Sequence, residues 1–398
     1  MEANHDGAAY RIIHSILQSA ILLQAVLAIL VTTVDATRLL NLLDDDCSLE
    51  ALRSYFVGGP GIAESGNDDG GLCPSLNLAE HNPNIIERVL RSKTPVLLRN
   101  VERLWPDVDE ATRAWRPDSL VAEYGSRHIA VQISSSVAGH FDCARRELPC
   151  SELVEEMSVR DFFAGRPPAA AAGSVAYWQN NEIADSGVEE LAMAPPFTNT
   201  EIVSHRQWVS RDNVSAAFHF DYDPNFVLVR QGAKTFYTYD MFQSAFLAPG
   251  LSLQDDFHTA VQFGAVDPRI RSRKRYPRFE NARGWRCTAR KGDLLFIPAY
   301  HWHFVETNVE NDKFAIAINW FVHAPKEDRL PDKCYRELPY SIADFILELS
   351  QEDDDDATKR LRARRDQFAE ARALHDLQML QEDFYEEEDD DDGGKDEL

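Results

Sequence analysis

Short apolar segments separated by glycine and proline turns fill the second half of the chain, and they restrict its fold more than any other feature. We predict strands at residues 175–178, 226–229, 235–239, 294–297 and 314–320. Turn residues stand at Gln231-Gly232 and at Lys291-Gly292-Asp293. Many short strands with such turns are typical of barrels and jelly rolls. The sequence therefore predicts a mainly β fold.

The first half adds helices to this pattern. Apolar runs predict strands at residues 95–99 and 129–133, with a short helix at residues 118–124 between them. Ser158, followed three residues later by Asp161, is typical of a capped helix start. Period and composition predict two further helices, at residues 341–349 and 357–380. We therefore expect helices that flank the β core.

The two ends of the chain carry signals that point to one compartment. Residues 12–34 are mostly apolar and lead into Val34-Asp35-Ala36, so residues 1–36 are typical of a secretory signal peptide. A signal anchor is an alternative because the stretch could just span a bilayer, and a buried soluble helix is another. The last four residues, Lys395-Asp396-Glu397-Leu398, match the endoplasmic-reticulum retrieval signal. We expect residence in the lumen of the endoplasmic reticulum, the retrieval receptor as a partner, and no stable membrane span if the signal is cleaved.

The charge of the chain is strongly negative and uneven. The formal net charge is −25, and residues 351–398 hold 19 acidic and 7 basic side chains. We therefore expect no nucleic-acid or anionic-membrane partner, since such binding would need a local basic patch. Such a patch exists at residues 269–278, where a solvated loop, an acidic substrate groove and a dock for the acidic tail are all open interpretations.

Six cysteines are an even number, which permits up to three disulfides in an oxidising compartment. No Cys-x-x-Cys pair is present, so redox-isomerase and zinc-ribbon interpretations lack their usual motif. We expect local pairing of Cys47 with Cys73 and of Cys143 with Cys150, with free core thiols as the alternative.

A metal site is suggested by His219 and Asp221, which stand two residues apart. If this segment is extended, both side chains leave the same strand face and can chelate one ion. A third ligand would come from the His301-Trp302-His303 segment, which follows a turn and an apolar strand. Two histidines and one carboxylate form the facial triad of non-haem iron(II) oxygenases, which leaves coordination positions open for a co-substrate and dioxygen.

The residues around these ligands resemble the two halves of a JmjC (cupin-type) 2-oxoglutarate-dependent oxygenase. The resemblance spans residues 94–322 and is strongest in residues 218–240 and 292–320. The matching positions there, besides the metal-site residues, are Asn225, Phe226, Gly232, Lys234, Phe236, Gly292, Asp293, Ile297, Pro298, Trp302, Val305, Ile316, Asn319 and Trp320. This resemblance implies a double-stranded β-helix, the jelly-roll core of cupins.

The resemblance also implies residue roles. His219, Asp221 and His303 would hold iron(II), and Lys234 would bind the distal carboxylate of 2-oxoglutarate. A dianion removed from water needs such a cationic partner. The other residues implied to line the co-substrate pocket are Tyr177, Gln179, Asn225 and Asn319.

Two assignments stay open in the sequence. His301 is the rival third ligand, although the register of the family motif, in which an aromatic residue directly precedes the ligand, favours His303. Family members often carry a serine or threonine three residues before the first histidine, where this chain has Ala216, with Ser215 one residue earlier.

One sequon for N-glycosylation, Asn213-Val214-Ser215, lies close to the expected site, so both a glycan and a shielded asparagine are open.

The domain organisation follows from these observations. We expect a signal segment at residues 1–36, a loop-rich segment at 37–85, a JmjC/cupin-type oxygenase domain at 86–335, and a helical acidic tail at 336–398. The resemblance implies an oxygenase that uses iron(II), 2-oxoglutarate and O2, releases succinate and CO2, and hydroxylates a protein side chain in the secretory pathway. A non-catalytic scaffold with the same fold is the alternative from another class, and histone demethylation finds no zinc or chromatin-reading motif.

Overall fold

The structure is a computed structural model. It describes residues 71–77, 85–101, 113–135, 140–141, 152–165, 174–182, 188, 191, 200–253, 260–269, 276–309 and 313–325, with a few positions between 347 and 366. The expected signal segment and most of the acidic tail lie outside these residues and stay predictions. Within the described residues, no helix is both long and apolar enough to cross a membrane.

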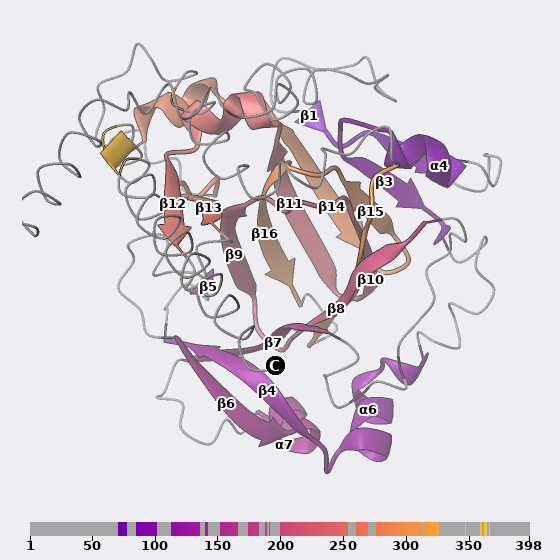
Figure 1. The fold of residues 1–398 in the computed structure, drawn as a ribbon. Coiled ribbons are helices and arrows are strands. Elements are labelled where there is room, and N and C mark those ends of the chain that lie inside the picture. Colours follow the sequence, from indigo (N-terminus) through magenta and orange to yellow (C-terminus); the bar gives the residue numbers. More distant parts are fainter. Residues whose placement is uncertain are drawn as a thin grey trace, which may run out of the picture.

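Two β-sheets form the described core (Figure 1). The eight-stranded sheet has the order β1 (Gly71–Leu72), β14 (Trp285–Arg290), β11 (Ala233–Tyr239), β16 (Trp302–Asn308), β9 (Val214–His219), β13 (Ala260–Gly264) and β12 (Pro249–Leu253), with β5 (His140–Phe141) paired to β9. The nine-stranded sheet has the order β2 (Ser75–Asn77), β3 (Val96–Arg99), β15 (Leu294–Ile297), β10 (Asn225–Gln231), β17 (Ala315–Val322), β8 (Ile202–Ser210), β7 (Val175–Glu182), β4 (His128–Ser134) and β6 (Glu152–Ser158).

The central strands alternate between the two sheets along the chain, as a jelly roll requires. Strand β9 belongs to the first sheet, β10 to the second, β11 to the first again, and β15 and β16 divide in the same way. The sequence-based prediction of a mainly β, double-stranded β-helix core is confirmed by this topology. The predicted strands at residues 95–99, 129–133, 175–178, 226–229, 235–239, 294–297 and 314–320 fall on β3, β4, β7, β10, β11, β15 and β17.

Short helices flank the second sheet. They are α4 (Ile85–Leu90), α6 (Pro117–Tyr124) and α7 (Val159–Ala164), and two 3-10 turns lie at Met241–Phe246 and Pro277–Asn281. Figure 1 shows α6 and α7 beside β4 and β6, at the end of the molecule away from β12 and β13. Ser158 caps α7 as predicted, since its hydroxyl oxygen accepts a hydrogen bond from the Asp161 backbone N–H at 3.1 Å.

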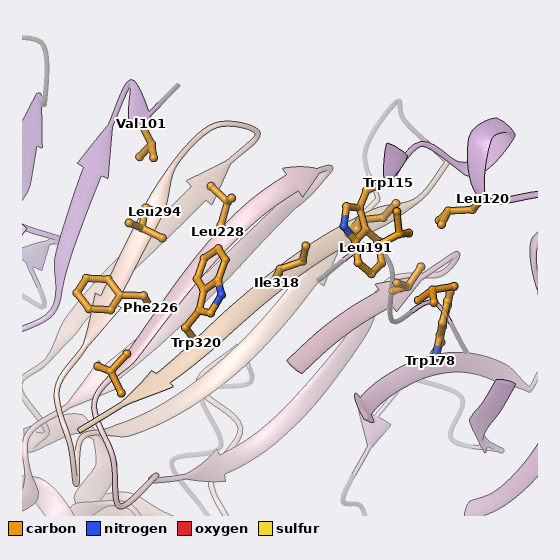
Figure 2. Packing of buried hydrophobic residues seen from close by; sticks show 14 of the residues in the cluster. Val101, Trp115, Leu120, Trp178, Leu191, Phe226, Leu228, Leu294, Ile318 and Trp320 are labelled. Carbon is orange, nitrogen blue, oxygen red and sulfur yellow. The ribbon is translucent and has the colours of Figure 1, made fainter. Parts of the chain in front are cut away.

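Successive side chains along the central strands point alternately into an outer apolar cluster and into the barrel interior. On β10, Phe226 and Leu228 pack into the larger apolar cluster, while Val227 and Val229 belong to a second cluster with residues of β11 and β14. Figure 2 shows Phe226, Leu228 and Trp320 within the larger cluster, with Trp115 and Trp178 farther along it. Because successive strand residues point to opposite faces, the neighbour Asn225 points into the barrel with Val227.

Two of the predicted turns depend on glycine. Gly232 joins β10 to β11 with φ of 69°, and Gly292 precedes β15 with φ of 82°. A Cβ atom on Gly232 would lie 2.8 Å from the Asn308 carbonyl oxygen and 2.9 Å from the Phe314 carbonyl oxygen. Both the left-handed backbone and this close approach therefore require glycine at the hairpin.

The segment at residues 71–77 closes one edge of the barrel, although the sequence predicts a loop there. Strand β1 pairs with β14 in the first sheet, and β2 pairs with β3 in the second, so this segment crosses between the sheets. A disulfide joins Cys73 to Cys287 on β14, with 4.7 Å between their Cα atoms. The predicted Cys47–Cys73 pairing is therefore wrong.

The reason for this error is distance along the chain. Cys73 and Cys287 are separated by 214 residues, so only the pairing of β1 with β14 brings them together. The predicted Cys143–Cys150 pair lies outside the described residues and stays a prediction. Part of the basic insert is described: Arg269 pairs with Asp267 at 2.8 Å, and its guanidinium carbon lies 5.1 Å from the Phe304 ring centroid.

Candidate metal centre

Three of the predicted ligands meet at one end of the barrel. His219 is the last residue of β9, His303 is the second residue of β16, and the two stand opposite each other in the antiparallel register. Asp221 follows β9 in the loop rather than in an extended strand. The ligand atoms of His219, Asp221 and His303 all lie within 4.8 Å of one another.

The geometry of the group is close. The His303 Nε2 atom lies 3.5 Å from the Asp221 Oδ2 atom, and the two histidine ring centroids are 4.2 Å apart. The backbone N–H of Tyr300 donates to the Asp221 carbonyl oxygen at 2.7 Å, which ties the loop of Asp221 to the turn that precedes β16. Tyr300 itself has φ of 58°, a left-handed backbone that costs free energy outside glycine. The loop is therefore held in a specific shape at the candidate site.

Both histidines have one ring nitrogen fixed by a backbone carbonyl. The Nδ1 atom of His219 is 2.8 Å from the Ala217 carbonyl oxygen, and that of His303 is 2.9 Å from the His301 carbonyl oxygen. A carbonyl oxygen only accepts, so Nδ1 carries the proton in each ring and Nε2 keeps its lone pair for a metal ion. Burial lowers the pKa of His303 to about 4, with a further lowering from His219, so the ring is neutral at pH 7. A ligand set of two imidazoles and one carboxylate fits a divalent transition metal.

His301, the rival ligand, does not join this group. Within the described residues, the metal-binding geometry selects only His219, Asp221 and His303. The His301 ring is buried, with its centroid 5.6 Å from that of Trp285, and burial lowers its pKa to about 3. His301 precedes β16, whereas His303 lies within the strand, so the alternation of a strand does not apply to the pair.

Lys234 lies farther inside the barrel with two hydroxyl groups around its ammonium. Its Nζ atom donates to the Tyr177 hydroxyl at 2.9 Å and to the Thr307 hydroxyl at 2.8 Å. Only 3% of Lys234 is exposed, and this burial lowers its pKa to about 7. In the described part of the chain no carboxylate pairs with this ammonium. The group is therefore a buried cation that an anionic ligand would stabilise.

The position of Lys234 relative to the metal ligands follows from β16. Thr307 is opposite Lys234 in the pairing of β16 with β11, and it lies four residues after His303. Even-numbered steps along a strand stay on one face, so the Lys234–Thr307 pair and His303 face the same interior, about 13 Å apart along the strand.

The other predicted pocket residues divide into two groups. Asn319 donates to the Asn225 side-chain oxygen at 3.2 Å and accepts from the Trp208 indole N–H at 2.8 Å. Gln179 instead bonds to Gln132 on β4. The structure therefore places Tyr177 with Lys234, joins Asn225 to Asn319, and leaves Gln179 in a separate side-chain pair.

Two polar residues of the pocket were missed in the sequence. Thr307 is buried and contacts Lys234, and the position four residues after His303 on the same strand was the available signal. Trp208 contacts Asn319 across 111 residues of sequence, and no local pattern marks it. Thr307 brings a hydroxyl to the pocket in a chain that has Ala216 where the family often has serine or threonine.

Comparison with known proteins gives relatives along most of this domain. Residues 83–328 match the cupin-like domain family. The tRNA wybutosine-synthesizing protein 5 of Gallus gallus is 24% identical over 265 residues, which cover 63% of this chain and 76% of that protein. The bifunctional peptidase and (3S)-lysyl hydroxylase JMJD7 of Homo sapiens is 24% identical over 314 residues, or 69% of this chain and 92% of its own length. Lysine-specific demethylase 8 of Danio rerio is 23% identical over 242 residues, which cover 59% of this chain and 54% of that protein.

The family match includes every strand from β3 to β17 and all three members of the candidate metal group. It also agrees with the jelly-roll order of the two sheets. This chain therefore belongs to the cupin-like domain family, among the JmjC oxygenase relatives that its motifs resemble.

Proposed function

We propose that the protein is an iron(II)- and 2-oxoglutarate-dependent oxygenase that hydroxylates a protein side chain in the lumen of the endoplasmic reticulum. One observation carries the proposal. A group of two histidines and one carboxylate faces the same barrel interior as a buried lysine whose described side-chain partners are both hydroxyls. The first suits a divalent metal and the second an anionic co-substrate. A structural scaffold has no need for both together.

Each residue has a defined task in this reaction. Iron(II), when bound, would supply the centre at which 2-oxoglutarate, dioxygen and a substrate C–H bond are converted to succinate, CO2 and a hydroxylated product. His219, Asp221 and His303 would hold the ion, and the backbone carbonyls of Ala217 and His301 keep the two rings oriented.

Lys234, Tyr177 and Thr307 would bind the distal carboxylate of 2-oxoglutarate. The ammonium supplies the charge, and both hydroxyls that now accept from it can turn to donate to a carboxylate. Asn225 and Asn319, held by Trp208, would line the pocket from the opposite sheet. This arrangement keeps the co-substrate in a water-poor interior, where ionic hydrogen bonds are strongest.

The relatives favour a protein substrate over a small molecule. One of them is named as a (3S)-lysyl hydroxylase and is matched along 92% of its length. Another is named as a lysine-specific demethylase, and a third acts in tRNA wybutosine synthesis. We propose hydroxylation because, of these three relatives, the hydroxylase is matched over the largest share of both chains.

Two features support residence in an oxidising lumen. The chain ends in Lys395-Asp396-Glu397-Leu398, and disulfides such as the one between Cys73 and Cys287 persist in the secretory pathway. Removal of the last four residues should send the protein to the culture medium. Continued retention would show that an anchor or a partner holds it instead.

The experiment that tests the chemistry is succinate formation. The chain without residues 1–36 is purified, loaded anaerobically with iron(II) and given 2-oxoglutarate and oxygen, with His219→Ala as the control. The proposal is supported if the unmodified protein forms succinate without an added protein substrate and His219→Ala does not. Absence of both iron binding and turnover in the unmodified protein would favour the scaffold.

A further inference from the structure

The sequon Asn213-Val214-Ser215 lies at the opposite end of its strand from the metal centre. Asn213 is exposed and immediately precedes β9, whereas His219 ends this strand. Six residues of strand span about 20 Å. The sequon is therefore far from the metal ligands in space, although its Val214 stands opposite Thr307 of the Lys234 pocket.

The asparagine side chain is held in a way that leaves its nitrogen available. Its Oδ1 atom accepts a hydrogen bond from the Val309 backbone N–H at 3.1 Å, which fixes the amide against the end of β16. N-glycosylation modifies the Nδ2 atom and leaves the amide carbonyl unchanged. The hydrogen bond to Val309 can therefore persist in the glycosylated protein.

We propose that Asn213 carries an N-linked oligosaccharide that covers the end of the barrel away from the metal centre. The amide nitrogen of Asn213 forms a bond to the first sugar of a lipid-diphosphate-linked oligosaccharide. The bond from that sugar to the diphosphate breaks, the lipid diphosphate leaves, and the amide loses one proton to a base of the transferase. A polar glycan there does not cover the end of the barrel that carries His219 and His303.

The fold also fixes when the transfer takes place. Ser215, whose hydroxyl the transferase must recognise as part of the sequon, is only 1% exposed once β9 lies between β13 and β16. The sequon is therefore readable only before β9 enters the sheet. Transfer precedes folding of the barrel, and the folded protein is not a substrate.

This proposal rests on the lumenal part of the proposed function and not on the oxygenase reaction. The test expresses the full chain in mammalian cells and measures gel mobility with and without an endoglycosidase that removes N-glycans. We expect a one-glycan shift in the unmodified chain and none in Asn213→Gln. The Asn213→Gln variant should keep its succinate formation, because the exposed Asn213 side chain lies at the opposite end of β9 from His219 and is neither a metal ligand nor a partner of Lys234.

A second variant separates a failed site from a failed location. Arg283→Ser, made in the Asn213→Gln background, turns the exposed Asn281 into the acceptor of an Asn281-Ala282-Ser sequon. Glycosylation of this variant but not of the unmodified chain would overturn the proposal while the lumenal location stands. Absence of a glycan from both would overturn the proposal and the lumenal location together, with the succinate assay unaffected.

Discussion

His301 and His303 are two residues apart and equally buried, yet only His303 lies with His219 and Asp221. We predict that His303→Ala abolishes iron binding, because loss of one of three protein ligands removes the chelate. His301→Gln should keep iron binding, since its ring lies against Trp285 and outside the ligand group. Iron content after anaerobic loading measures both. Loss of iron binding in His301→Gln, together with retention of iron binding in His303→Ala, would reverse the ligand assignment.

Lys234 should make 2-oxoglutarate binding depend on pH. Burial lowers its pKa to about 7, so the side chain is an ammonium below pH 7 and increasingly neutral above it. Binding of a carboxylate needs the ammonium form, so above pH 7 the neutral Lys234 amine must take up a proton when 2-oxoglutarate binds. The KM for 2-oxoglutarate should therefore rise about tenfold per pH unit there.

The matched variants for this prediction differ in charge. Lys234→Arg keeps the cation at every accessible pH and should flatten the KM profile. Lys234→Ala should raise the KM about 10- to 100-fold at pH 7, as expected for the loss of hydrogen bonds to a charged group. An unchanged pH profile in Lys234→Arg would show that another group controls binding.

At the scale of elements, the cap of α7 is a local contact that can be removed alone. Ser158→Ala loses the acceptor for the Asp161 backbone N–H and should lower the free energy of unfolding by about 1 kcal/mol. Ser158→Asp retains an acceptor and serves as the control. Chemical denaturation measures the difference, and equal stability of Ser158→Ala and the unmodified protein would contradict it.

Elements differ in how far their sequence predicts them. Strands β10 and β15 each contain a run of four apolar residues with a glycine turn close to one end and a proline close to the other, so their positions follow from local pattern. Strands β1 and β2 have two and three residues, and each exists only because a partner strand supplies its hydrogen bonds. Local pattern therefore could not distinguish them from a loop.

At the scale of the whole molecule, the disulfide joins the segment at residues 71–77 to the interior of the first sheet. Its removal in the double variant Cys73→Ala, Cys287→Ala should lower the free energy of unfolding by about 2–5 kcal/mol. In the unmodified protein a reductant should cause a similar loss, and the double variant should be less sensitive to it. Equal reductant sensitivity of the two proteins would mean that this bond does not contribute.

The sequence by itself determined the metal motif, the turn glycines, most central strands and the cap of α7. Each depends on residues close together in the chain, so spacing and side-chain chemistry suffice to predict them. The tertiary structure alone decided that Thr307 contacts Lys234, that Trp208 holds Asn319, that Cys73 pairs with Cys287, and that Asn213 lies away from the metal centre. These relations join residues on different strands or opposite ends of one strand, and strand register, which arises only when the two sheets assemble, brings such residues together or holds them apart.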